Sequence, residues 1–205
     1  MHQTVLLSTA YMPPAGYLSL LSRARTALVE KEENYIKQTY RNRCEIITAN
    51  GTLTLTVPVL QGSFHKTAIK ECRIDYTKRW PQVHLRAISA AYRAAPYFDF
   101  YYNEIEKIIT KQPLFLLDLN HALLAFLVSA MKITVAIQYT DSFTPARNAP
   151  GDYRYRITPK AAPFLPAAPY NQVFPAEQRY AANLSSIDLL FNTGPDAIHY
   201  LNRHF

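Results

Sequence analysis

The stretch TVLLSTAYMPPAGYLSLLSRARTALVE, residues 4–30, decides the fold that the sequence predicts. It starts with a short apolar run at 4–9 and ends with another at 26–30. Between these runs, the pair Pro13-Pro14 suits a turn or a first helical position, and further residues then recur at helical spacing: Tyr17, Leu20, Leu21 and Ala24. Strand, helix and strand within about 25 residues is the length of a tight βαβ unit, so we expect the two strands to pair in parallel.

A β-hairpin is predicted immediately downstream. Asn50-Gly51 is a strong signal for a type I′ turn, and the residues on both sides of it alternate between β-forming apolar and polar types. Pairing across this turn sets Arg43 opposite Pro58. Because side chains alternate along a strand, Arg41 and Arg43 would share one face, with Asn42 among the apolar side chains on the other.

The remaining elements follow from the same two periodicities. They are a strand at 68–75, helices at 79–96, 97–109 and 118–131, a strand at 133–140, and a last helix that is capped by Ser185 or Ser186 and ends at Gly194-Pro195. The sequence therefore predicts an α/β fold. It consists of a small, partly parallel sheet with flanking helices, and the Asn-Gly hairpin is added to that sheet or lies beside it.

The domain organisation is predicted from the prolines. Seven of the 14 prolines fall within residues 141–175, where they cannot sustain a helix or a central strand. We expect an α/β core domain at 1–140 and a Pro-rich extended segment at 141–175 that packs on the core. Residues 176–205 would form a C-terminal helical cap of the same domain.

Composition limits the class of protein. The chain has 205 residues, 49% of them hydrophobic, which is enough for one substantial core. No apolar run is long enough to span a membrane, and the N-terminus lacks the pattern of a signal peptide. These features predict a soluble, cytoplasmic protein. Peripheral contact with a membrane is compatible with this prediction. Cys44 and Cys72 are expected to be reduced and buried, and no Cys/His spacing resembles a metal site.

The net charge of +7 favours an anionic partner. Nucleic acid is the least favoured of these partners, because the basic residues are dispersed and no RNA-binding motif is present. The five glycines form neither a phosphate-binding loop nor a dinucleotide fingerprint. The sequence specifies no cofactor and no oligomeric state.

The densest positive charge lies in YIKQTYRNR, residues 35–43. Arg41 and Arg43 on one strand face can grip a phosphate or carboxylate in bidentate fashion, and Lys37 adds a point charge. An exposed ladder of ion pairs with Glu45 explains the same spacing equally well. Asn42 favours function slightly, because an amide on an apolar face needs hydrogen-bond partners.

Two further groups of residues are candidates for chemistry. His84 lies one helical turn from Trp80, with Tyr92 on the same stripe, which suits a general base beside a stacked sugar or base. A core histidine that is bonded to a carbonyl is the favoured alternative. Glu30 and Glu33 follow the second predicted strand, where α/β sheets usually bind ligands, so they are candidates for a general base or magnesium ligand, with a solvated turn as the alternative.

Several stretches resemble the WbqC-like proteins in order and spacing. They are AYMPPAGYLSLLSRA (10–24), KQTYRNRCEI (37–46), LTLTVPV (53–59) and NLSSIDLLFNTGP (183–195), within a resemblance that covers roughly residues 5–201. One departure concerns the start, where LSTAYMPP stands in place of the H-Q-P-x-Y-x-P of many members. Any role of that His-Gln pair is therefore not carried over.

The resemblance implies a place in bacterial surface-polysaccharide (O-antigen) assembly, where members have been proposed to transfer glycine to a sugar. We therefore expect a transferase that moves an aminoacyl or other acyl group onto a nucleotide- or lipid-linked sugar. The alternative is a non-catalytic subunit that binds the sugar nucleotide or carrier. The expected catalytic residues are His84, Glu30 and Glu33, and the expected ligand-binding residues are Tyr11, Lys37, Tyr40, Arg41, Asn42, Arg43, Trp80 and Tyr92. Within that set, Trp80 and Tyr92 would form the sugar platform.

Overall fold

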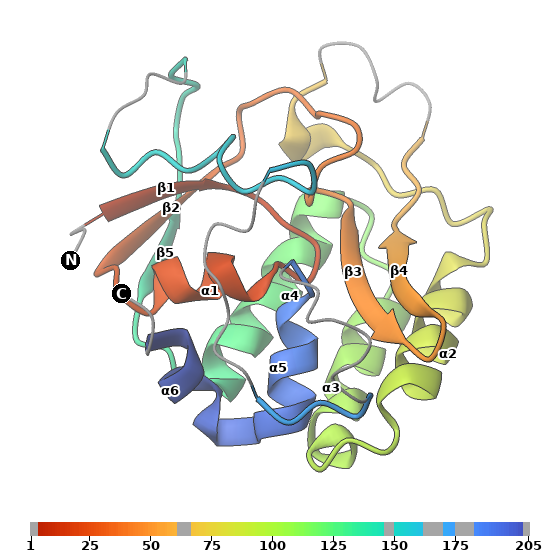
Figure 1. Cartoon of the computed structure of the whole chain (residues 1–205). Coiled ribbons are helices and arrows are strands. Elements are labelled where there is room, and N and C mark those ends of the chain that lie inside the picture. The colour runs from red at the N-terminus through yellow and green to blue at the C-terminus, as the bar shows by residue number, and fades with distance from the viewer. Residues whose placement is uncertain (1–3, 61–66, 146–149, 162–169, 175–182, 203–205) are drawn as a thin grey trace.

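The computed structural model describes residues 4–60, 67–145, 150–161, 170–174 and 183–202 (Figure 1). The fold is α/β, as predicted. Its strands are β1 (Thr4–Ser8), β2 (Thr26–Glu30), β3 (Arg43–Thr48), β4 (Gly51–Thr56) and β5 (Ala136–Tyr139). Its α-helices are α1 (Ala15–Leu21), α2 (Trp80–Tyr92), α3 (Phe98–Thr110), α4 (Leu116–Ala130), α5 (Ser186–Thr193) and α6 (Ala197–Asn202), with short 3₁₀ turns at Ile69–Glu71 and Gly194–Asp196.

The predicted βαβ unit is confirmed. Strands β1 and β2 pair in parallel, with Ser8 opposite Glu30 at their carboxyl ends, and β5 adds a third parallel strand on the other edge of β2. Every second side chain of β1 and β2 is buried, starting with Val5 and Ala27, because one face of this sheet packs on the helices. Both strands therefore end in polar residues at the same edge.

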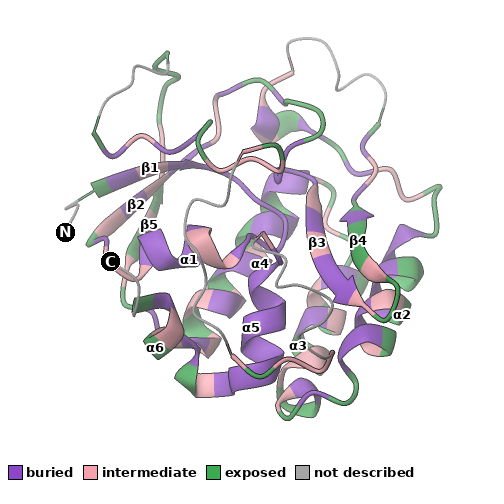
Figure 2. Ribbon diagram, in the orientation of Figure 1, coloured by how far each residue is buried: buried purple, intermediate pink, exposed green. Residues whose placement is uncertain are grey.

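The core lies between this sheet and the helices. Figure 1 places α1, α4, α5 and α6 on one side of the sheet, and all eight residues of α5 are buried, as the purple ribbon in Figure 2 shows. The hairpin of β3 and β4 forms a separate two-stranded sheet that packs on α2, where the Tyr92 hydroxyl accepts a hydrogen bond from the Ile47 amide. The hairpin thus lies beside the parallel sheet and is not part of it.

The predicted register of the hairpin is wrong by two residues. Arg43 pairs with Thr56, and the turn residues are Ala49 and Asn50, with Gly51 already in β4 at φ 101°. A shift of two preserves the faces, so the apolar side chains and Asn42 still point inward. A left-handed Gly51 is needed in either register, which is why the sequence signal for a turn was right while the pairing was not.

Two other expectations about strands are also wrong. The strand expected to carry Arg41 and Arg43 begins only at Arg43, because residues 37–42 form turns and bends, with Gln38 at φ 58°. Residues 68–75 hold a 3₁₀ turn and isolated bridges in place of a strand. In both cases the segment bonds to separate parts of the chain, such as Tyr35 to Thr67 and Ile69 to Glu33, and this competes with a continuous ladder.

The described parts of the predicted Pro-rich segment contain neither helix nor strand and lie against the core. Gly151 and Tyr153 exchange backbone hydrogen bonds with Leu6 of β1. Farther along, the side chains of Tyr170 and Gln172 donate to the buried Asp188 carboxylate of α5. Residues 146–149, 162–169 and 175–182 lie outside the described residues, so the predicted boundaries at 141–175 and 176–205 stay predictions.

The last helical region begins as the sequence indicates. Ser185 caps α5 by accepting a hydrogen bond from the Ile187 amide. The helix ends at Thr193, and Gly194 leads through a 3₁₀ turn into α6. In the part of the chain that the structure describes, no helix combines the length and hydropathy that crossing a bilayer requires.

Candidate functional site

The carboxyl edge of β1 and β2 holds a buried ion pair between Glu33 and Arg41. Arg41 donates from Nε and Nη2 to the two carboxylate oxygens, at 2.9 and 2.6 Å, and both side chains are at most 3% exposed. The fork of a guanidinium matches a carboxylate in this geometry. Arg41, which the sequence predicts to bind a ligand anion, is therefore already bonded to Glu33, which the sequence predicts as a general base.

A second ion pair lies at the same edge. Arg154 donates to Glu30 Oε2 at 2.9 Å and to both carboxylate oxygens of Asp152, and it also donates to the carbonyl of Thr144. The hydroxyl of Thr140, just after β5, donates to the other oxygen of Glu30 at 2.6 Å. These bonds tie the segment around residue 154 to the ends of two strands.

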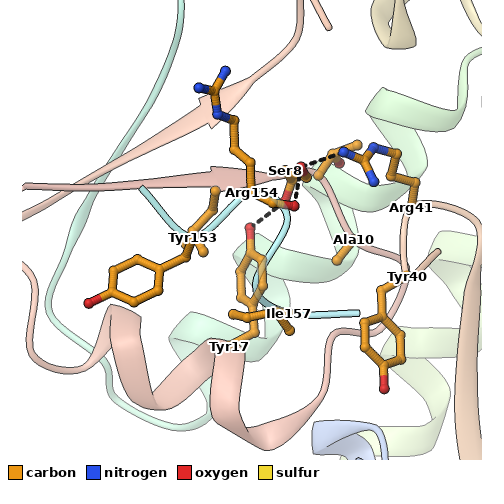
Figure 3. A pocket seen from close by; sticks show the side chains of 10 residues that line it. Ser8, Ala10, Tyr17, Tyr40, Arg41, Tyr153, Arg154 and Ile157 are labelled. Atoms are coloured by element: carbon orange, nitrogen blue, oxygen red, sulfur yellow. Dashed lines mark hydrogen bonds between the residues drawn. The ribbon is translucent and has the colours of Figure 1, made fainter. Parts of the chain in front are cut away.

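Ser8, the last residue of β1, connects the two pairs. Its hydroxyl accepts from Arg41 Nη2 at 2.7 Å and donates to the Arg154 carbonyl at 3.1 Å, while the Tyr17 hydroxyl donates to its backbone oxygen (Figure 3). These residues, with Tyr40, Tyr153 and Ile157, line a cavity of about 10 Å³, which is close to the space that one water needs. The cavity has a mixed polar and apolar lining and is too small for a substrate.

Buried ion pairs of this kind are weak evidence for stability. The cost of removing both charges from water offsets most of their attraction, and apolar residues of similar volume often stabilise a protein as well or better. Four charged side chains that converge at the ligand-binding edge of a parallel sheet therefore point to a function. The edge is the candidate site of this protein.

Two aromatic side chains at this edge, Phe143 and Tyr155, are exposed to solvent. Tyr155 donates a hydrogen bond to Glu33 Oε2 at 3.3 Å, and its ring is in cation–π distance of Arg41 and Arg154. Burial, followed by the charge of Glu33, raises the pKa of the Tyr155 phenol, which keeps it protonated as a donor. The ring of Phe143 is also within cation–π distance of Arg154.

Four residues at or next to this edge are not predicted from the sequence: Ser8, Asp152, Arg154 and Asn120. Asn120 donates from its buried amide to the Thr9 hydroxyl and to the Arg41 carbonyl. A polar residue inside the apolar run at 114–131 was a signal for such a partnership, because a buried amide needs acceptors. For Arg154 the only local signal was a charged, aromatic YRYR at 153–156 within the Pro-rich segment.

His84 lies in a closed aromatic cluster and not at the carboxyl edge. Tyr11 shares a 2.9 Å hydrogen bond with His84 Nδ1, and the rings of Tyr11 and Trp80 pack against the imidazole. Burial lowers the pKa of His84 to about 4, opposed by a hydrogen bond to the backbone of Thr56. These contacts match the alternative of a core histidine bonded to a carbonyl.

The other predicted ligand residues are dispersed. Trp80 and Tyr92 are buried, so neither offers the open ring face that a sugar platform needs, and this geometric expectation is wrong. Asn42 is buried and donates to the Val57 carbonyl. Lys37 is exposed in the turn region, and Arg43 is half-buried on β3.

The expected pairing of Arg41 with Arg43 on one strand face is also wrong, because Arg41 precedes the strand and bonds to Glu33. Tyr40 does line the cavity at the edge. Within the described residues, no group of three or more His, Cys, Asp or Glu side chains is arranged to hold a metal ion.

Comparison with known proteins adds a relative and a family. A protein of Mycobacterium tuberculosis that is described as uncharacterized, Rv1507c, is 34% identical over 99 residues, which are 48% of this chain and 42% of the relative. The match thus spans less than half the length of that relative. The pattern of the WbqC-like protein family matches residues 9–162, a range that includes both ion pairs of the carboxyl edge. This chain therefore belongs to the WbqC-like protein family.

Proposed function

We propose that this protein is a transferase of bacterial surface-polysaccharide assembly. It moves an aminoacyl group, with glycine as one candidate, or another acyl group onto a nucleotide- or lipid-linked sugar. The reaction takes place at the carboxyl edge of β1 and β2. The observation that carries the location is the convergence of the Glu33–Arg41 and Glu30–Arg154 pairs at that edge.

Acyl transfer needs a group that takes a proton from the acceptor as the new bond forms. Glu33 and Tyr155 supply a relay for this proton. The acceptor hydroxyl or amine gives its proton to the Tyr155 oxygen while the phenol gives its own proton to Glu33 Oε2, 3.3 Å away. The acyl carbon then exchanges its bond to the leaving group for a bond to the acceptor, and the leaving group departs with the proton returned through the phenol.

Arg41 supports this step through its position. It holds the Glu33 carboxylate with two hydrogen bonds, which fixes the acceptor of the relay relative to Tyr155. His84 is assigned no part in the step, because its ring is buried in the cluster with Tyr11 and Trp80 and does not lie at the carboxyl edge. The family's association with O-antigen gene clusters supports the choice of a sugar acceptor.

A second candidate is a non-catalytic subunit that binds the same sugar. The observation that favours it is the full occupation of both glutamates: Glu30 accepts from Arg154 and Thr140, and Glu33 accepts from Arg41 and Tyr155. Such carboxylates can act purely as parts of a rigid binding edge. This candidate predicts ligand binding without turnover.

The test has two stages. A thermal-shift screen against nucleotide sugars, acyl-CoAs and aminoacyl donors first identifies the ligand class, because a ligand of the folded state raises the melting temperature. The purified protein is then incubated with the best donor and acceptor, and acylated sugar is measured by mass spectrometry. Tyr155→Phe is compared with the parent, since it keeps the ring and removes only the relay hydroxyl.

The transferase predicts product formation that falls by about 100-fold in Tyr155→Phe while the ligand still stabilises the variant. Product formation that is unchanged in Tyr155→Phe rules out the relay. Ligand binding without product from any donor class supports the binding subunit instead.

A further inference from the structure

Two large aromatic rings are exposed at the carboxyl edge. Phe143 is 46% exposed and Tyr155 is 42% exposed, whereas Tyr17 and Tyr40, which line the cavity at this edge, are buried. Exposed aromatic rings beside a polar site are a common means of holding a ligand's flat face. The position of these two rings is therefore informative.

Buried arginines underlie both rings. The Arg154 guanidinium carbon is 5.7 Å from the centre of the Phe143 ring and 5.8 Å from that of Tyr155, and Arg41 is 5.7 Å from Tyr155. These distances are within cation–π range. Because Arg41 and Arg154 are buried, the exposed surface of each ring is the part that faces away from them. Each ring therefore contacts a buried arginine on its inner side and exposes its remaining surface to solvent.

The charge behind the rings affects which ligand they favour in front. An aromatic face carries negative charge in its quadrupole, and this charge attracts positive groups, including the C–H bonds of a sugar. A guanidinium on the inner side of the ring polarises the ring's electrons toward itself. This weakens the attraction of the outer face for the C–H groups of a sugar. A flat, polarisable ring in an offset stack depends less on it, so the outer surface suits a heterocyclic base better than a pyranose.

Fixed positive charge continues next to the rings. Arg156 follows Tyr155 and is exposed. Its guanidinium carbon is 5.6 Å from the centre of the Tyr153 ring, and no ion pair among the residues described in the structure includes it. A guanidinium in this position can bind the phosphates that follow a base in a nucleotide. The net charge of +7 acts in the same direction.

We propose that Phe143 and Tyr155 form a stacking platform for the base of a nucleoside diphosphate, with Arg156 at its phosphates. Resting on the proposed function, this assigns the sugar's carrier as a nucleotide and not a lipid. The platform takes the place of Trp80 and Tyr92, which are buried. The competing explanation is that the two rings only shield Arg154 from water, which requires no ligand.

Isothermal titration with three probes separates these explanations. The probes are uridine diphosphate, adenosine diphosphate and glucose 1-phosphate, the last of which has phosphate and sugar but no base. The platform predicts that both nucleoside diphosphates bind the parent protein and that glucose 1-phosphate binds at least about tenfold more weakly. It also predicts that Tyr155→Ala and Phe143→Ala each weaken nucleotide binding about tenfold.

Two control variants sharpen the result. Tyr155→Phe keeps the ring and should keep the parent affinity for the nucleotides, even if it loses turnover. Phe100→Ala removes an exposed ring (74%) of α3, which is not part of the carboxyl edge. This variant should bind the nucleotides with the parent affinity. If Tyr155→Ala unfolds, Phe143→Ala decides, because the Phe143 side chain makes no hydrogen bonds.

Three results would overturn the platform. They are equal binding of glucose 1-phosphate and the nucleotides, unchanged nucleotide affinity in Phe143→Ala, or no nucleotide binding by the parent at all. Each leaves the proposed function testable on its own, since product formed from a lipid-linked sugar would support the transferase while excluding the nucleotide carrier. Loss of turnover in Tyr155→Phe with full nucleotide binding supports both proposals.

Discussion

Arg41 keeps a positive charge in a place from which water is nearly excluded. Its guanidinium is bonded to Glu33 and to the hydroxyl of Ser8, and its backbone carbonyl accepts from Asn120. Each of these partners comes from a different segment of the chain. The residue thus orients the carboxylate and joins the end of β1 to α4.

We expect Arg41→Ala to lower the free energy of unfolding by about 3–5 kcal/mol, because it leaves the Glu33 charge buried without its partner. The double variant Arg41→Met with Glu33→Gln should recover much of that loss, since it removes both charges. Urea unfolding of the parent and the variants measures this. Lys70→Ala is the matched control, because its ion pair with Glu32 is only partly buried and should be worth no more than about 1 kcal/mol. Equal losses of unfolding free energy in Arg41→Ala and Lys70→Ala would contradict the prediction that burial makes the Arg41 pair more costly to break.

His84 makes the stability of the protein depend on pH. Burial lowers its pKa in the folded state from 6.5 to about 4. Between these values the unfolded chain binds a proton that the folded protein does not, so the free energy of unfolding falls as the pH is lowered through this window. The full effect of this one group is about 3 kcal/mol.

The corresponding prediction uses His84→Gln, which cannot titrate. Urea unfolding at pH 7, 6 and 5 should show a steeper loss of stability in the parent than in the variant. Identical slopes in the two proteins would mean that His84 is accessible to protons in the folded state, and its role as a general base would then have to be considered again.

At the scale of the elements, Gly194 ends α5 and begins the turn into α6. Its φ is 56°, and a Cβ built there would be 2.5 Å from two ring carbons of Tyr97. The backbone of Tyr97 also donates to the carbonyl of Phe191, so this ring cannot move away freely. Because every residue of α5 is buried, the chain must turn directly after the helix in a tightly packed space, and Gly194 makes this turn.

Gly194→Ala should therefore destabilise the protein by about 1–3 kcal/mol from overpacking, in addition to about 1–2 kcal/mol from the left-handed backbone. Gly51→Ala is the control, since Gly51 has φ 101° but nothing within 4 Å of an added Cβ. Thermal unfolding of both variants compares them. A larger loss in Gly51→Ala than in Gly194→Ala would contradict the contact with Tyr97.

At the scale of the whole molecule, the segment around residues 150–157 closes the carboxyl edge. It pairs with β1 through Gly151 and Tyr153, and Arg154 bonds to Glu30 and Asp152. A segment rich in proline has few hydrogen bonds of its own, so its position depends on such long-range contacts. Arg154 makes two of them, to Glu30 and to the Thr144 carbonyl.

We expect Arg154→Ala to release this segment. Trypsin should then cleave after Arg156 faster than in the parent, while the core resists in both proteins. Mass spectrometry of the early fragments gives the cleavage rates, with Lys70→Ala as a control whose rate should match the parent. Rapid cleavage at Arg156 in the parent itself would show that the segment is a free linker and would remove the basis for a closed edge.

The sequence by itself determined the βαβ unit, most helix limits and part of the site. Apolar residues at a period of two or 3.6, a short connection and a serine cap are local signals, and local geometry acts on them before any tertiary contact forms. Glu30, Glu33 and Arg41 could be named from the sequence as residues of the candidate site, because Glu30 ends the second apolar run, Glu33 follows it and Arg41 lies in the densest run of positive charge. The turn that holds Arg41 was not predicted.

Only the tertiary structure decided which of these residues act together. Arg154 reaches Glu30 across 124 residues of sequence, and Asn120 reaches the Arg41 carbonyl across 79. No periodicity encodes such a pairing, because it results from how the sheet, α4 and the returning segment pack. The same packing enclosed His84 and Trp80 in the core and left Phe143 and Tyr155 exposed, since the burial of a ring is decided by the elements around it and not by its own sequence neighbours.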